Sequence, residues 1–67
     1  VVSMESAGKL LVIKTESGRA IASAAALDEL NWPQIVGCIA GDNTIFLAIR
    51  TPGETLSVLE KLKKITN

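Results

Sequence analysis

The residues able to do chemistry in this sequence are few and scattered. There is no histidine, and seven acids balance seven bases, so the net charge is zero. Without histidine, the usual general base of Ser-His or Cys-His catalysis is missing. The single thiol, Cys38, forms neither a zinc site nor an internal disulfide. No P-loop, GxGxxG or HExxH pattern occurs, so we expect no enzyme, no metal site and no cofactor.

Taken alone, the polar residues that remain have ordinary structural explanations. The pair Asp42 and Asn43 is typical of a tight hairpin turn, and Asp28 of a solvated helix position. Cys38 is typical of a small core residue, and Trp32 of an anchor at a helix end. These residue types therefore do not by themselves define a ligand site.

Size and charge indicate a chain that needs partners of its own kind. A domain of 67 residues builds only a small core, and without disulfides or metal it gains stability by oligomerising or by packing on a neighbouring domain. A balanced charge disfavours direct DNA binding. No apolar run approaches 18 residues, so we expect no membrane contact. A lone thiol and no visible signal peptide favour a cytoplasmic location.

The order of elements follows from periodicity and turn residues. Short apolar segments predict strands, alanine-rich and 3.6-periodic segments predict helices, and Thr51-Pro52 followed by Glu54 predicts a helix start. In chain order the expected elements are strands at 1–5 and 10–15, a helix at 19–30, strands at 35–40 and 44–49, and a helix from 51 to 65. We therefore predict an α/β two-layer (α+β) fold of order β-β-α-β-β-α, a four-stranded mainly antiparallel sheet with two helices on one face.

The sheet raises a problem of burial. Alternation turns Leu10 and Val12 to one side and Leu11 and Ile13 to the other, so both faces of this strand are apolar. A strand that is apolar on both sides is normally covered on both sides. Since two helices cover one face, we expect a second subunit to cover the other.

Residues 37–45 read GCIAGDNTI, an apolar segment that leads into a Gly-Asp-Asn turn. This segment is similar to GTIAGDDTI, the signature of a known family that the sequence resembles, the C-terminal domain of bacterial arginine repressors. Further segments also resemble the family, in order: residues 10–15 with Gly18, residues 27–33, and residues 50–52 with the closing helix. The resemblance covers nearly the whole chain.

The resemblance implies a single C-terminal oligomerisation and effector domain spanning residues 1–67. Family members form trimers that stack into a hexamer, and L-arginine binds between the trimers as corepressor. Operator DNA is contacted by a separate N-terminal winged-helix domain, which is absent from this sequence. The expected partners are therefore other copies of the chain and L-arginine, which acts as an effector and not as a cofactor.

The resemblance also implies which residues contact L-arginine. A guanidinium group favours charged carboxylate partners, and Asp42 and Asp28 match the family's acidic positions. Ala40 matches a position that contributes backbone contacts. The remaining candidate positions are Ile21, Cys38 and Asn43, where the family has glutamine, threonine and aspartate. Each of these three replacements removes a polar or charged contact, for a combined loss of ~30-fold to ~10⁴-fold in affinity.

Two other functions remain open from the sequence. One is a paralogue that senses arginine poorly or not at all and acts mainly as a hexamerisation module. The other is an amino-acid-sensing regulatory domain of a metabolic enzyme. Sequence upstream of this domain would distinguish them, because a winged helix indicates a repressor and a catalytic domain indicates an enzyme.

Overall fold

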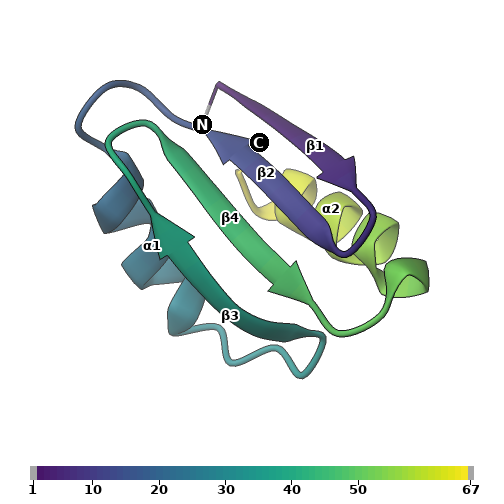
Figure 1. The fold of residues 1–67 in the computed structure, drawn as a ribbon. Helices are drawn as coiled ribbons and strands as arrows, with labels where there is room; N and C mark the ends of the chain where they lie inside the picture. Colours follow the sequence, from purple (N-terminus) through teal and green to yellow (C-terminus); the bar gives the residue numbers. More distant parts are fainter. Residues whose placement is uncertain (1, 67) are drawn as a thin grey trace.

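The structure, a computed structural model, describes residues 2–66 and has the expected order of elements. The four strands form one sheet of order β1-β2-β4-β3, in which all neighbours are antiparallel. Figure 1 shows both helices behind this sheet. The elements are β1 (Ser3–Ala7), β2 (Leu10–Lys14), α1 (Ala20–Asp28), β3 (Ile35–Ala40), β4 (Thr44–Ile49) and α2 (Pro52–Thr66). The predicted two-layer α+β fold is confirmed.

The core lies between the sheet and the two helices. Helix α1 packs on β3 and β4, and α2 packs on β1, β2 and β4. Because side chains alternate along a strand, one face of β2 and β4 supplies most of the buried sheet residues. The buried apolar residues are Leu11, Ile13, Ala20, Ala24, Ile45, Leu47, Ile49, Val58, Leu59 and Leu62.

The first strand and the first helix depart most from their expected bounds. The first strand was expected at residues 1–5 but is Ser3–Ala7, and Val1 lies outside the described residues. The strand extends to Ala7 because Gly8 supplies the positive φ (62°) that the tight turn requires. Helix α1 is shorter than the predicted 19–30, and Asn31 adopts a left-handed φ of 52° after it. The chain therefore leaves the helix ahead of the Trp32-Pro33 pair, although a residue before proline is itself kept out of helical conformation.

Helix α2 begins at Pro52, as the sequence predicts, and Thr51 and Glu54 bond to each other at its start. The hydroxyl of Thr51 donates to Oε1 of Glu54 (2.8 Å), and the backbone N–H of Glu54 donates to the carbonyl of Thr51 (3.1 Å). Ile65 continues the helical spacing of the buried residues Val58 and Leu62, which predicts burial, but it is 58% exposed. It lines an apolar cleft of about 240 Å³ between α1 and α2, because the helices sit apart on the sheet. Within the described residues, neither helix is long and apolar enough to cross a membrane.

One buried hydrogen bond ties α2 to the β1–β2 turn. The hydroxyl of Thr55 donates to the carbonyl of Gly8 (2.7 Å), and Thr55 is 2% exposed. We expect Thr55→Val to lower the free energy of unfolding by about 1–2 kcal/mol, because it keeps the shape and removes the donor. Urea unfolding measures this change. The exposed Ser57→Ala is the control, and an equal effect of both variants would contradict the assignment.

Candidate functional site

The turn between β3 and β4 holds Asp42 on the surface beside the start of α1. The backbone carbonyl of Asp42 accepts from the N–H groups of Gly18 (3.1 Å) and Ala20 (3.2 Å). Its carboxylate accepts one hydrogen bond, from the hydroxyl of Ser17 (2.9 Å). The backbone of Asp42 is therefore fixed, while its charged group remains exposed and open to a further donor.

The neighbouring Asn43 is also exposed, and its side chain is engaged within the turn. Its Oδ1 accepts from the hydroxyl of Thr44 (2.9 Å), and its backbone carbonyl accepts from the N–H of Thr15 (2.8 Å). The structural explanation of the Asp42-Asn43 pair as turn residues is consistent with these bonds. Asn43 supplies no negative charge beside Asp42.

Asp28 and Ile21 lie on one exposed flank of α1. They are seven residues apart, which is about two helical turns, so their side chains project on the same side of the helix. Ile21 is 70% exposed, and Asp28 is exposed at the last helical position. A large apolar residue therefore stands on the same exposed flank as the carboxylate, about 10 Å away along the helix axis.

The structure does not bring Asp28 and Asp42 together within one chain. Asp42 bonds to Ala20 at the start of α1, whereas Asp28 is the last residue of the same helix. A rise of 1.5 Å per residue separates the two helix ends by ~12 Å. One guanidinium group therefore cannot contact both carboxylates of the same chain.

Cys38 and Ala40 lie on β3 and face the core. They pair with the buried residues Leu47 and Ile45 of β4, and both are partly buried against the core. The Cys38 thiol approaches the carbonyl of Ala24 in α1, at 3.9 Å. Both side chains are only partly buried, and the backbone of these two residues runs along the edge of β3 that no described strand pairs with.

The environment of Cys38 makes its thiol less acidic. Burial raises the pKa of Cys38, and the negative charge of Asp28 raises it further. We expect alkylation by iodoacetamide to reach half its maximal rate at a higher pH than for a free cysteine, because only the thiolate reacts. Asp28→Asn should lower this midpoint, and Glu29→Gln should leave it unchanged. A midpoint unaffected by Asp28→Asn would contradict the proximity of the two groups.

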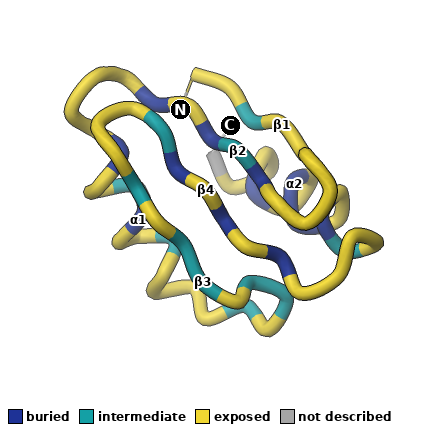
Figure 2. The backbone as a smooth tube through the Cα atoms, in the orientation of Figure 1, coloured by how far each residue is buried: buried dark blue, intermediate teal, exposed yellow. Residues whose placement is uncertain are grey.

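The sheet face away from the helices is apolar and uncovered within residues 2–66. We define the open face as Leu10, Val12, Ile39 and Phe46, of which Ile39 is 71% and Phe46 45% exposed. Val12, Phe46 and Ile39 are direct neighbours across β2, β4 and β3. Figure 2 shows this face toward the viewer, with exposed residues alternating with buried ones along β4.

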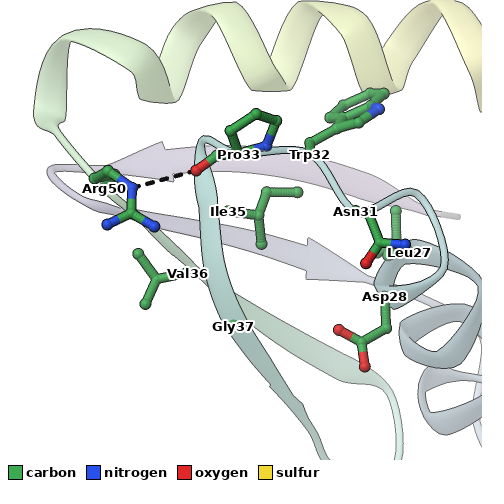
Figure 3. A pocket seen from close by; sticks show the side chains of 9 residues that line it. All are labelled: Leu27, Asp28, Asn31, Trp32, Pro33, Ile35, Val36, Gly37 and Arg50. Atoms are coloured by element: carbon green, nitrogen blue, oxygen red, sulfur yellow. Dashed lines mark hydrogen bonds between the residues drawn. The ribbon is translucent and has the colours of Figure 1, made fainter.

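A cavity of about 290 Å³ lies between the end of α1 and the start of β3 (Figure 3). Its lining includes Asp28, together with Asn31, Trp32, Gly37 and Arg50, which the sequence analysis did not assign to a site. Arg50 follows β4 directly, and the antiparallel pairing of β3 with β4 brings it beside Pro33 and Gln34. This register is a property of the folded sheet, and no signal in the sequence identified Arg50 as a site residue. Within the described chain, no three His, Cys, Asp or Glu residues cluster as a metal site would require.

The fold and these surfaces define a small two-layer α+β domain with an uncovered apolar sheet face. The family model described as "Arginine repressor, C-terminal domain" matches residues 1–64. The arginine repressor of Lachnoclostridium phytofermentans is 58% identical over 66 residues, which cover 98% of this chain and 43% of that protein. That of Lachnospira eligens is 55% identical over 64 residues, covering 96% and 42% of the two chains. That of Thermoanaerobacter sp. (strain X514) is 52% identical over 65 residues, covering 97% and 43%.

The chain therefore belongs to the arginine repressor C-terminal domain family, as the sequence resemblance indicated. It spans less than half the length of these relatives. Their names describe a repressor and not an enzyme.

Proposed function

We propose that this chain is the oligomerisation and L-arginine-sensing domain of a cytoplasmic transcription regulator of arginine metabolism genes. It assembles into trimers, and two trimers stack into a hexamer. Operator DNA is contacted by a separate winged-helix domain, because this domain has no net positive charge to hold a phosphate backbone. Membership of the arginine repressor family supports this assignment.

The observation that carries the proposal is the position of Asp42 and Asp28 at opposite ends of α1. Each carboxylate is exposed, and neither shares a cation with the other within one chain. A ligand that needs two carboxylates around one guanidinium therefore requires residues from more than one copy. Sensing then follows from assembly, since the effector binds where the copies meet.

The open face supplies the surface for assembly. Leu10, Ile39 and Phe46 are exposed and Val12 is half-buried, and a contiguous apolar patch of this kind often marks an interaction surface. Fully burying an exposed side chain of this size contributes ~1.5–3 kcal/mol, and less where the side chain is already partly buried. A second copy of the chain covers this face in the proposed trimer.

A weakly sensing paralogue is the second candidate. The Cys38 side chain faces α1, and the Asn43 amide oxygen is held by Thr44. Ile21 presents an apolar surface where the family has glutamine. These three positions support an assembly that forms readily and binds arginine with reduced affinity.

Isothermal titration calorimetry with L-arginine and L-citrulline tests the proposal. Citrulline has the same shape but a neutral urea group, so it lacks the charge that Asp42 and Asp28 favour. We expect a binding signal with arginine and none with citrulline at the same concentrations. Equal binding of both ligands, or no binding of arginine at millimolar concentration, would contradict arginine sensing.

A further inference from the structure

The proposed arginine contacts give the carboxylate of the ligand no charged side-chain partner. L-arginine carries a guanidinium, an ammonium and a carboxylate, whereas the proposed side chains include two acids and no base. A carboxylate bound on a protein usually meets charged or backbone donors, and leaving it without them costs affinity. A base that lines the same cavity as one of the two aspartates would complete the site.

The cavity at the end of α1 contains such a base. Asp28 and Arg50 both line it, although they come from α1 and from the end of β4. Figure 3 shows Asp28 on the α1 side and Arg50 on the opposite side of the start of β3, with the guanidinium tip directed away from Pro33. The cavity therefore carries opposite charges at two separate places on its wall.

Arg50 is held so that its outer nitrogens stay available. Its backbone N–H donates to the carbonyl of Gln34 (2.8 Å), and its Nε donates to the carbonyl of Pro33 (3.2 Å). These bonds fix the base of the guanidinium and leave Nη1 and Nη2 for a fork-like contact with a carboxylate. Among residues 2–66, neither Arg50 nor Asp28 forms an ion pair.

Other bases with defined positions are less suited to this role. Lys14 donates to the hydroxyl of Thr44 (3.0 Å), and Lys61 lies over the Trp32 ring, 5.5 Å from its centroid. Arg19 precedes the start of α1, at the end of the helix opposite to Asp28. Arg50 is the one base in the lining of the Asp28 cavity.

We propose that Arg50 binds the carboxylate of the effector, while Asp28 holds a cationic group of the same molecule. This inference rests on the proposed function, because it assigns a further contact to the arginine site. The ligand class that fits is a basic amino acid with its carboxylate intact. Arg50 thereby determines specificity against decarboxylated analogues.

Calorimetry with two ligands and three variants tests this assignment. The ligands are L-arginine and agmatine, which is arginine without its carboxylate. Arg50→Gln keeps an N–H donor for the Pro33 carbonyl and loses the charge, and Arg50→Lys keeps the charge. Arg19→Gln removes the same charge outside the cavity and serves as the matched control.

We expect Arg50→Gln to weaken L-arginine binding about tenfold or more and to leave agmatine binding unchanged within about twofold. Arg50→Lys should recover part of the loss, and Arg19→Gln should bind both ligands normally. Retained agmatine binding also shows that a variant is folded. If Arg50→Gln does not fold, Arg50→Lys is the deciding variant. A change in its ratio of L-arginine affinity to agmatine affinity supports the assignment, and an unchanged ratio overturns it.

The other outcomes separate this inference from the proposed function. If the wild-type chain binds both ligands and Arg50→Gln weakens both equally or neither, the role of Arg50 is wrong and arginine sensing stands. An equal loss of L-arginine affinity in Arg19→Gln also overturns the role of Arg50, because the loss then comes from the changed net charge of the chain. If the wild-type chain binds neither ligand, the proposed function fails and this inference fails with it.

Discussion

Asp42→Asn is expected to abolish the calorimetric signal for L-arginine, a loss of about 100-fold or more. The Asp42 carboxylate is exposed and has a single side-chain donor, Ser17, so it keeps acceptor capacity for a guanidinium. The variant keeps an oxygen to accept from Ser17 and loses only the charge. The turn itself should persist, because the backbone bonds of Asp42 do not involve its side chain.

The reverse change at the next position should strengthen binding. Asn43→Asp keeps an acceptor for the Thr44 hydroxyl and restores the second charge of the family signature. We expect a gain in affinity of about tenfold, since a charged hydrogen bond is roughly twice as strong as a neutral one. Glu16→Gln, which removes an exposed carboxylate outside the turn, is the control and should bind normally. Normal binding by Asp42→Asn together with unchanged binding by Asn43→Asp would show that the assigned site is wrong.

Phe46→Asp is expected to dissociate the assembly into monomers. Phe46 lies at the centre of the open face, between Val12 and Ile39, so a charge there would be buried against a second copy. Burying an unpaired carboxylate costs several kcal/mol, which corresponds to a weakening of association by more than about 100-fold. The domain itself should remain folded, because Phe46 is 45% exposed and points away from the helices.

Leu56→Asp is the matched control for this variant. Leu56 is 60% exposed on α2, on the opposite side of the sheet from the open face. Sedimentation equilibrium should show wild-type assembly for Leu56→Asp and monomers for Phe46→Asp. Equal behaviour of the two variants would mean that the open face is not the assembly surface.

Much of the fold could be predicted from local sequence signals. The apolar run at 44–49 and the Gly-Asp-Asn turn indicate β4 and its hairpin, and the Thr51-Pro52 pair indicates the start of α2. The end of α1 was less predictable, because Asn31 takes a left-handed conformation that few residues other than glycine adopt. Ile65 fits the periodicity of a buried stripe, but its exposure depends on how far apart two helices lie on the sheet.

The candidate site was predictable only in part. The family signature located Asp42 and Asn43, and helical periodicity placed Ile21 on the flank of Asp28. The neighbourhood of Arg50 and Asp28 depends on the pairing of β3 with β4 and on the packing of α1 against β3. Such long-range contacts have no local pattern in the sequence, so Arg50 was identified only from the residues that line the cavity.

In the proposed hexamer, two replacements favour assembly without arginine. Like charges gathered between the proposed trimers would repel one another, and a cationic ligand would relieve that repulsion. Asn43 removes one negative charge per copy, and the exposed Ile21 offers apolar area on the same flank of α1 as Asp28. Both changes favour stacking of trimers without the effector.

Sedimentation velocity of the wild-type chain at micromolar concentration, with and without saturating L-arginine, tests the central claim of an assembly domain most directly. We predict a trimer or a larger assembly in both conditions, with the hexamer already present without ligand and little changed by adding it. A trimer that becomes a hexamer only with arginine would reject the effector-independent stacking. A stable monomer in both conditions would contradict the account as a whole.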